Sequence, residues 1–237
     1  MDQRDTYLHL VKVLDQTDRY QETIDAMKYV IKLNPELNTE EQQLLSSSYK
    51  NAIEKSRNAL RQLTEIIAST DDEQKKQGLL EIQQKMFHEL ETYCNDLINL
   101  IETQLLPVAK DSASKIFFEQ LEADYLRYNC ESNETTERKE LEQKADEHYR
   151  RALEISSGNL PSYSPIALGL ILNYSVFLFE VVGEKEKALK LAQDTYNDSS
   201  QTYTQNSPEQ SVHEAELILG YLDDNIKLWT SHMNKEE

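Results

Sequence analysis

Helix-breaking residues are scarce in this chain, and most of them fall where helices would have to end. Five glycines and five prolines occur among 237 residues. A β-rich chain would need more of them, because its strands are separated by turns roughly every ten residues. The good helix formers Leu, Glu, Gln, Lys and Ala dominate the rest of the sequence. The sequence therefore predicts an all-α protein before any motif is considered.

The breakers and two polar stretches divide the chain into nine predicted helices. The breaks lie at 34–35, 69–72, 106–107, 131–136, 158–165, 183 and 207–208. The predicted helices are 3–17, 20–33, 39–68, 73–106, 112–130, 137–156, 165–181, 185–204 and 209–233. Thr39 is the predicted N-cap of the third helix, and Ser207 with Pro208 is the predicted start of the ninth. Short connections predict antiparallel neighbours within a single domain over residues 1–237.

The charge and cysteine content limit the partners and the compartment. The formal net charge is −18 and the pI is about 4.7, which argues against binding to nucleic acid or to an anionic membrane. Cys94 and Cys130 have neither a metal-ligand spacing nor a disulfide pattern. The N-terminus is charged and lacks the pattern of a signal peptide. We therefore predict a cytoplasmic protein.

The most apolar stretch, residues 166–182, is interpreted as a core helix. It has Asn173 at its centre and Glu180 near its end, and it is shorter than the roughly 20 apolar residues of a membrane span.

Nothing in the sequence predicts catalysis. The five histidines form no zinc motif, and there is no glycine-rich phosphate loop. The 43 Asp and Glu residues make paired carboxylates common anywhere in the chain, so such pairs carry no information about acid–base chemistry. We predict no enzymatic activity, no cofactor and no metal.

A basic stripe is the first feature that points to a ligand. In the segment 42–61, Lys50, Arg57 and Arg61 fall within roughly 40° of one another on a helix. They border the apolar ridge, which consists of Leu45, Tyr49, Ala52, Ile53, Leu60 and Leu63. The stripe is either a solvated face with i,i+4 partners such as Glu54, or a site for an anion.

Four sequence blocks resemble the 14-3-3 family. They are LLSSSYKN at 44–51, DYLRY at 124–128, LGLILNYSVF at 168–177 and DDNIKLWTS at 223–231. They occur in the family's order and near its spacing, and weaker similarity extends from about residue 7 to residue 231. The resemblance implies a cup of nine antiparallel helices with an amphipathic groove. It also implies an adaptor that docks phosphoserine or phosphothreonine segments of client proteins and regulates them.

The resemblance assigns the phosphate site to Lys50, Arg57, Arg127 and Tyr128. The phosphate brings about two negative charges and three acceptor oxygens, which several cationic donors can hold. Arg61 matches a supporting arginine of the family. For Arg127 alone, a structural ion pair with Asp124 or Glu131 is the competing interpretation.

Two family cations are missing from this site. A lysine of the fifth helix is replaced by Gln120, and an arginine of the third helix by Ser56. We therefore expect a phosphate site that is less positive than is usual in the family.

The resemblance assigns the peptide groove to residues from two later helices. These residues are Leu172, Asn173, Val176, Glu180, Leu217, Ile218, Tyr221, Asn225 and Trp229. Side-chain amides can both donate to and accept from a peptide backbone, and Glu180 is expected to favour an arginine upstream of the phosphosite. For the leucines and the valine, core packing is the competing interpretation. Tyr221 stands where the family has a leucine, and Gly220 lies inside the last helix.

The family forms dimers, and the resemblance predicts a homodimer here. Arg19 with Glu89, and Glu22 with Lys85, match two intersubunit salt bridges of the family. Thr17, Gln62 and Ile82 depart from the family's interface residues, so an altered interface is the alternative. Ala59 stands where many members have a regulatory serine.

The rival hypothesis for function is a helical scaffold of the tetratricopeptide kind. It would bind unphosphorylated acidic or C-terminal peptides, and the basic residues would hold a carboxylate. The sequence names neither the clients nor their preferred phosphorylated motif.

Overall fold

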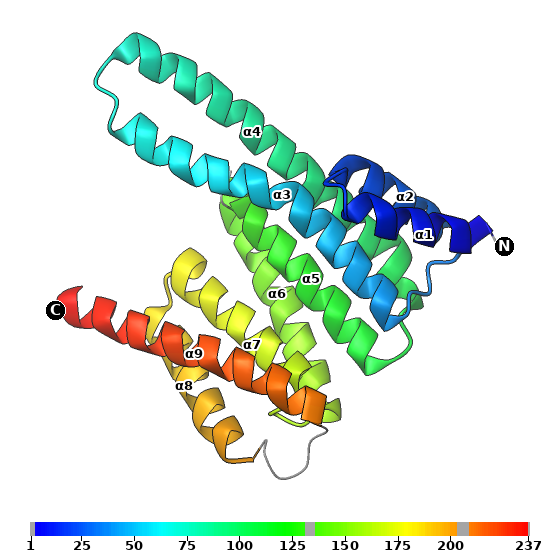
Figure 1. The fold of residues 1–237 in the computed structure, drawn as a ribbon. Helices are drawn as coiled ribbons and strands as arrows, with labels where there is room; N and C mark the ends of the chain where they lie inside the picture. The colour runs from blue at the N-terminus through cyan, green and yellow to red at the C-terminus, as the bar shows by residue number, and fades with distance from the viewer. Residues whose placement is uncertain (1–2, 131–135, 203–208, 237) are drawn as a thin grey trace. The chain divides into compact units, whose positions relative to one another are not determined.

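The computed structural model describes residues 3–130, 136–202 and 209–236, and every regular element within these ranges is helical. Figure 1 shows α1 (Gln3–Asp15), α2 (Tyr20–Leu33), α3 (Thr39–Ala68), α4 (Glu73–Leu100), α5 (Ser112–Cys130), α6 (Thr136–Asn159), α7 (Pro165–Phe177), α8 (Lys185–Thr202) and α9 (Glu209–Glu236). Two π-helical segments, η1 (Ile101–Leu105) and η3 (Leu178–Val182), follow α4 and α7. A 3-10 turn, η2 (Leu106–Val108), follows η1. The all-α prediction is confirmed.

Within the described residues, the predicted breaks lie close to the ends of the helices, although α6 continues through Gly158 to Asn159. The predicted helix 3–17 ends earlier, at Asp15, and Asp18 in the following turn has a left-handed φ of 56°. Gly183 ends η3 with a φ of 80°, a conformation that glycine adopts without strain. The predicted start of the ninth helix at 207–208 lies outside the described residues, as does most of the polar stretch 131–136.

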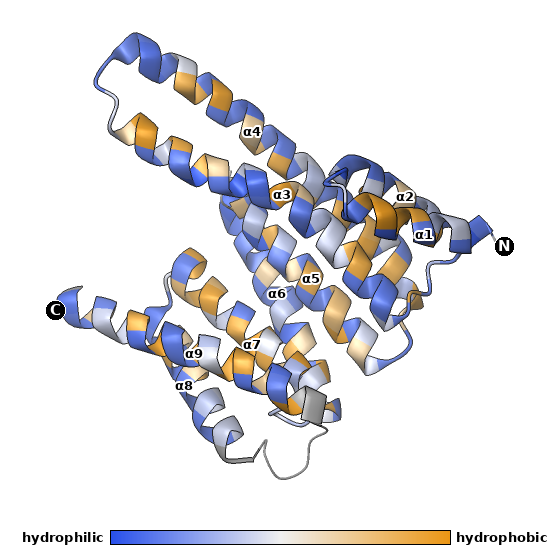
Figure 2. Cartoon of the chain, in the orientation of Figure 1, coloured by the Kyte–Doolittle hydropathy of each residue, from blue (hydrophilic) through white to orange (hydrophobic). Residues whose placement is uncertain are grey.

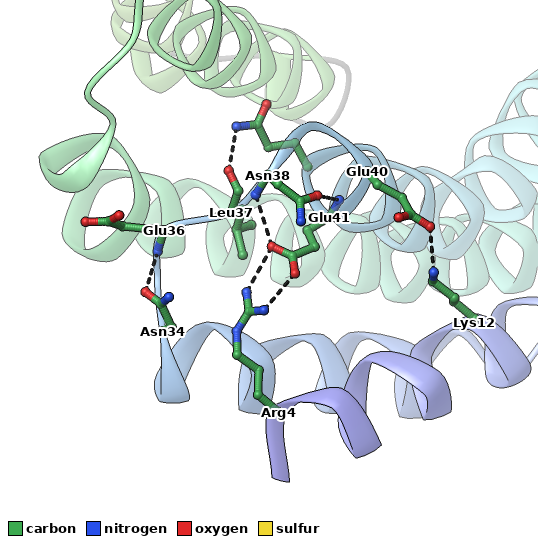
Figure 3. Close-up of polar contacts among 9 residues, drawn as sticks. Arg4, Lys12, Asn34, Glu36, Leu37, Asn38, Glu40 and Glu41 are labelled. Atoms are coloured by element: carbon green, nitrogen blue, oxygen red, sulfur yellow. Dashed lines mark hydrogen bonds and ion pairs between the residues drawn. The ribbon is translucent and has the colours of Figure 1, made fainter. Parts of the chain in front are cut away.

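The predicted N-cap of α3 was wrong, because Asn38 and not Thr39 caps this helix. Figure 3 shows the Asn38 side chain accepting a hydrogen bond from the Glu41 N–H at 3.0 Å, while the Glu41 carboxylate accepts from the Asn38 N–H at 3.0 Å. This reciprocal capping box requires Glu or Gln three residues after the cap. Three residues after Thr39 comes Gln42, whose amide instead donates to the Leu37 carbonyl at 3.1 Å.

The same carboxylate ties α1 to α3. Arg4 donates two hydrogen bonds to Glu41, at 2.7 and 2.9 Å, in the bidentate arrangement that guanidinium and carboxylate groups favour (Figure 3). Burial by itself would raise the pKa of Glu41, but the hydrogen bonds from Arg4 and from the Asn38 N–H lower it. Lys12 adds an exposed ion pair with Glu40 at 2.5 Å.

The chain forms two compact units, and each has its own core. The first unit contains α1 to α4 with η1 and η2. Fully buried side chains come from all four helices and η1, and include Val11, Ile24, Met27, Ile31, Leu45, Tyr49, Leu90, Leu97, Ile101 and Leu105. Figure 2 shows apolar and polar residues alternating around α3 and α4, the pattern of helices with one buried face.

The second unit contains α5 to α9 with η3, and α7 packs against α5, α6, α8 and α9. Tyr149, Tyr174 and Phe177 form an aromatic cluster with ring centroids 5.2 to 6.3 Å apart. Residues 165–182 are long and apolar enough to cross a membrane by length and composition, with a mean hydropathy of 1.8. The contacts of α7 with four neighbouring helices agree with its interpretation as a core helix. The single domain over residues 1–237 stays a prediction.

A buried polar cluster joins α5 to α6. His148 Nδ1 lies 2.7 Å from a carboxylate oxygen of Glu119, and its Nε2 lies 3.1 Å from one of Glu122. Glu122 is fully buried, and the other two residues are at most 9% exposed. Polar groups that are buried this deeply need partners, and these contacts join the two helices at this point.

Candidate functional site

The predicted basic stripe lies on α3, in the first unit. Lys50 and Arg61 are exposed and Arg57 is half-buried. On the predicted ridge, Leu45, Tyr49, Ala52, Ile53 and Leu60 are all buried, whereas Leu63 is half-buried. The prediction that cations border a buried ridge is therefore confirmed.

Tyr49 sets the direction of its neighbour Lys50. The Tyr49 hydroxyl donates to Asp96 of α4 at 2.5 Å, and Lys28 of α2 pairs with the other oxygen of that carboxylate. Burial, followed by the nearby Asp96 carboxylate, raises the pKa of the Tyr49 phenol well above its usual range. The phenol therefore stays a neutral hydrogen-bond donor. With Tyr49 held inward, Lys50 is rotated by about 100° around the helix and reaches solvent.

The solvated-face interpretation predicted an ion pair between Lys50 and Glu54. Within the described parts of the chain, Lys50 and Arg61 are exposed and form no ion pair, so the pairing of Lys50 with Glu54 is not seen, while the solvated face and the anion site both stay predictions. Ser56, which replaces a family arginine, is half-buried, and so is Ala59.

Arg127 lies on α5, in the second unit, and is held from two sides. Its Nη2 lies 3.5 Å from Asp124 Oδ1, and its guanidinium carbon lies 4.5 Å from the centroid of the Tyr128 ring. Tyr128 in turn meets Tyr125 edge to face, with ring centroids 5.3 Å apart. The predicted ion pair with Asp124 is confirmed, and Glu131 lies outside the described residues.

The charge of Arg127 is permanent although its side chain is only 12% exposed. Burial works against the charge, but the Tyr149 hydroxyl and the Asp124 carboxylate raise the pKa of the guanidinium above its already high ordinary value. Its Nε is buried and has no hydrogen-bond partner among the described residues. The structure thus holds a desolvated cation with an unused donor.

Asp124 contacts side chains from three helices of the second unit, although the sequence predicted it only as a partner of Arg127. Its Oδ1 accepts from the Tyr149 hydroxyl of α6 at 2.5 Å, and its Oδ2 accepts from the Asn173 amide of α7 at 2.8 Å. Burial and the Asp124 carboxylate raise the pKa of Tyr149 well above its usual range, so the phenol remains a donor. The three-residue spacing of Asp124 and Arg127 is visible in the sequence, whereas Tyr149 gave no signal.

The predicted groove residues lie on α7, η3 and α9, which pack together in the second unit. Leu172, Asn173 and Val176 are half-buried on α7, and Glu180 is exposed on η3. On α9, Leu217 and Tyr221 are 53% and 50% exposed. Ile218 and Asn225 are half-buried. Core packing therefore does not explain Leu217.

Trp229 differs from the other predicted groove residues. Its side chain is 2% exposed and its ring stacks on Phe179 of η3, with centroids 4.6 Å apart. The ring therefore packs α9 against η3, and its contact with a peptide stays a prediction. Gln120, which replaces a family lysine, is half-buried on α5.

The predicted dimer residues lie on the first unit. Arg19 pairs with Glu22 of the same chain, three residues on, and this hydrogen bond lowers the pKa of Glu22. Lys85 and Glu89 are exposed on α4. The unit also exposes large apolar side chains: Leu10 at 41%, Val13 at 44%, Ile66 at 51% and Ile82 at 51%. The salt bridges between subunits stay predictions.

Within the parts of the chain that the structure describes, no group of three or more His, Cys, Asp or Glu side chains is arranged to hold a metal ion. Each unit presents side chains that can contact a polypeptide: outward-facing cations on α3 in the first unit, and half-exposed amide and apolar side chains on α7 and α9 in the second.

Comparisons with known proteins identify the class. The sequence model of the family described as 14-3-3 protein matches residues 10–230. The chain is 38% identical over 241 residues to 14-3-3 protein 3 of Entamoeba histolytica, covering 99% of this chain and 98% of that protein. It is 34% identical over 240 residues to 14-3-3 protein epsilon of Drosophila melanogaster, with 100% and 91% covered. It is 33% identical over 237 residues to the 14-3-3-like protein GF14 iota of Arabidopsis thaliana, with 99% and 88% covered.

The chain belongs to the 14-3-3 family. The predicted resemblance is confirmed, and with it the assignment as a non-enzymatic adaptor that binds other proteins.

Proposed function

We propose that the protein captures phosphoserine- or phosphothreonine-containing segments of client proteins and thereby regulates them. Lys50 and Arg57 of α3 and Arg127 and Tyr128 of α5 bind the phosphate. A phosphate with about two negative charges and three acceptor oxygens needs several cationic donors. The four residues supply three cations and a hydroxyl.

The state of Arg127 carries this proposal. Its guanidinium is permanently charged, its side chain is 12% exposed, and its buried Nε has no hydrogen-bond partner among the described residues. A buried donor without a partner costs about 1–3 kcal/mol. Because Nε itself is covered, an incoming phosphate meets the donors at the exposed part of the guanidinium, and its charge offsets the cost of holding this cation out of water.

The polypeptide around the phosphate binds to the groove residues. Asn173 and Asn225 pin an extended backbone, because each amide both donates and accepts. Leu217 and Tyr221, both at least half exposed, receive apolar side chains of the client. Glu180 is exposed and pairs with an arginine upstream of the phosphosite. A peptide without that arginine should therefore bind more weakly.

The direct test is fluorescence anisotropy with a labelled phosphoserine peptide that has an upstream arginine, alongside its unphosphorylated twin. We expect saturable binding of the phosphorylated form alone. Equal binding of both peptides would contradict the proposal and favour the scaffold that binds unphosphorylated acidic or C-terminal peptides. Binding of neither would also contradict it, and would point to Gln120, Gly220 and Tyr221 as changes that close the groove.

A charge-reversal pair locates the site. Lys50→Glu should abolish binding of the phosphorylated peptide. Lys190→Glu is the matched control, because Lys190 is exposed on α8 and has no predicted role. The control makes the same change in net charge, so its affinity should stay within about twofold of wild type. Intact binding by Lys50→Glu would refute the phosphate-site assignment.

We further propose a homodimer in which α1 and α2 of one copy meet α3 and α4 of the other. The exposed Leu10, Val13, Ile66 and Ile82 support it, because surface ion pairs alone contribute only about 0–1 kcal/mol each. Sedimentation velocity should show a dimer that Val13→Asp dissociates and Leu228→Asp, on the second unit, does not. A monomeric wild type at micromolar concentration would refute this arrangement.

A further inference from the structure

We infer that Asp124 is a positioning residue that orients both the Arg127 guanidinium and the Asn173 amide for peptide capture. The inference rests on the proposed function and extends it, because it assigns one carboxylate to both phosphate and backbone recognition. The residues concerned lie on α5, α6 and α7, which pack against one another in the second unit (Figure 1).

The chemistry of a carboxylate sets the orientation of Asn173. Asp124 Oδ2 lies 2.8 Å from the Asn173 side-chain nitrogen. An ionised carboxylate can only accept hydrogen bonds, so the nitrogen of the amide must face it. The carbonyl oxygen of Asn173 and its second N–H are then turned away from Asp124. One buried acceptor thus decides which way round the amide is presented.

The same carboxylate holds Arg127 without occupying its donors. Its Oδ1 lies 3.5 Å from Arg127 Nη2, which is beyond the usual range of an N–H···O hydrogen bond and far from a bidentate pair. The contact is an electrostatic one that restrains the guanidinium without taking up its donors, although the Tyr149 hydroxyl hydrogen-bonds to the same guanidinium. Tyr128, 4.5 Å away, limits movement on the ring side.

Tyr149 explains why Asp124 does not move toward either partner. Its hydroxyl donates to Asp124 Oδ1 at 2.5 Å, and Tyr149 is fully buried. Each oxygen of the carboxylate therefore has a fixed donor, from α6 and from α7. The fixed position of Asp124 therefore sets the direction of the Asn173 amide and the place of the Arg127 guanidinium.

Asp124→Asn tests the assignment, because the new amide keeps the shape but loses the charge and cannot accept through both atoms. We expect the affinity for the phosphoserine peptide to fall roughly tenfold to a hundredfold. The matched control is Asp146→Asn. Asp146 also accepts from a tyrosine, Tyr174, at 2.8 Å and pairs with an arginine, Arg150, at 2.8 Å, but no contact joins it to Arg127 or Asn173.

The affinity of Asp146→Asn for the phosphoserine peptide should stay within about twofold of wild type, once titration has determined what fraction of each protein is able to bind. If Asp146→Asn lost as much affinity as Asp124→Asn, the inference would be overturned. Both losses would then reflect a general loosening of α6, which carries Asp146 and the Asp124 partner Tyr149.

A double-mutant cycle shows whether Asp124 acts through Asn173. If it does, Asp124→Asn combined with Asn173→Ala should weaken binding by clearly less than the product of the two single losses. Losses that multiply would overturn the coupling.

A measurement without peptide keeps this inference separate from the proposed function. In the peptide-free protein, the Asn173 side-chain NH₂ resonances should move on Asp124→Asn and stay in place on Asp146→Asn. Unmoved Asn173 resonances would overturn the positioning role even if the phosphopeptide binds. A wild type that binds no phosphopeptide would refute the proposed function, while the NH₂ shift would still support the positioning role.

Discussion

The two units hold their cations in opposite ways. On α3, Lys50 is exposed, and its direction comes only from its neighbour Tyr49, which is fully buried. On α5, the Arg127 side chain is 12% exposed and has Asp124 on one side and the Tyr128 ring on the other. One unit presents a flexible charge and the other presents a fixed one.

This difference separates two contributions to binding. A long exposed side chain loses up to about 2 kcal/mol of rotamer entropy when a ligand orders it. Arg127 has lost that freedom on folding, so its contacts with an anion oppose less entropy. We therefore expect Arg127 to determine the geometry of the bound anion, and Lys50 to contribute mainly long-range attraction that salt weakens.

The largest effect tests the buried polar character of the second unit. His148→Ala leaves the buried Glu119 and Glu122 carboxylates without the group between them, and should cost about 3–5 kcal/mol of unfolding free energy. His88→Ala is the control in the first unit. Its side chain is 83% exposed and 3.9 Å from Glu91, so the change should stay within about 0.5 kcal/mol. Urea unfolding measures both free energies. Similar losses in the two variants would show that the buried polar cluster of the second unit contributes no more than an exposed pair of the first.

The next effect concerns the shape of the fixed cation. Arg127→Lys keeps the charge but removes the planar guanidinium, and should lower the affinity for the phosphopeptide about a hundredfold. Lys50→Arg should bind within about threefold of wild type, because an exposed side chain can adjust to either group. Isothermal titration calorimetry gives both affinities. An Arg127→Lys variant that binds like wild type would show that preorganisation is unimportant here.

A smaller effect separates attraction from structure on α3. Lys50→Gln should lower the affinity for the phosphopeptide about tenfold. It should leave the unfolding free energy within about 0.5 kcal/mol of wild type. The difference from wild type should shrink as salt rises, because exposed charges are screened. Anisotropy titrations over a salt series measure this, and a salt-independent difference would contradict the role of Lys50 as a flexible charge.

Two glycines of the second unit should respond with opposite signs. Gly220 lies inside α9, and a Cβ there would meet no atom within 4 Å. Gly220→Ala should therefore raise the unfolding free energy by up to about 1 kcal/mol. Gly183 has a φ of 80°, so Gly183→Ala should lower it by about 1 kcal/mol. Thermal unfolding of both variants checks the pair, and a destabilising Gly220→Ala would mean that α9 needs the freedom of glycine.

The smallest effect is a pH dependence in the first unit. The pKa of Glu41 is lowered in the folded protein, so its contribution is complete above about pH 4.5 and is lost as the pH falls through the folded value. Arg4→Gln should flatten the fall of the unfolding free energy between about pH 5 and 3, by less than about 1 kcal/mol. Lys12→Gln should flatten the profile less than Arg4→Gln does, because Lys12 makes the smallest of the contributions that lower the pKa of Glu41 and forms no hydrogen bond with it. An unaltered slope in Arg4→Gln would show that the Arg4 hydrogen bonds do not set this pKa.

Helix positions were predictable because the breakers are few and the apolar spacing is regular. The buried ridge of α3 and the pairing of Asp124 with Arg127 follow from positions on a single helix. The turns η1 and η3 were not predicted, because apolar spacing does not distinguish the i,i+5 bonds of a π-helix from those of an α-helix. The cap at Asn38 was missed although its spacing to Glu41 is visible.

The contacts that organise the site were less predictable, because they join separate helices. Asn173 and Tyr149 meet Asp124 from 49 and 25 residues away. His148 meets Glu119 from 29 residues away. Helical spacing decides which face a residue occupies but not how two faces slide along each other. Those partners therefore became visible only when α5, α6 and α7 were placed side by side.

Glu41 also has a consequence for the order in which the chain assembles. Its capping box closes within four residues, whereas Arg4 reaches the same carboxylate from 37 residues away. Short loops close faster and at a smaller entropic cost than long ones. We therefore expect the carboxylate to be oriented before Arg4 reaches it, so that α1 attaches to α3 late in folding and detaches early in unfolding.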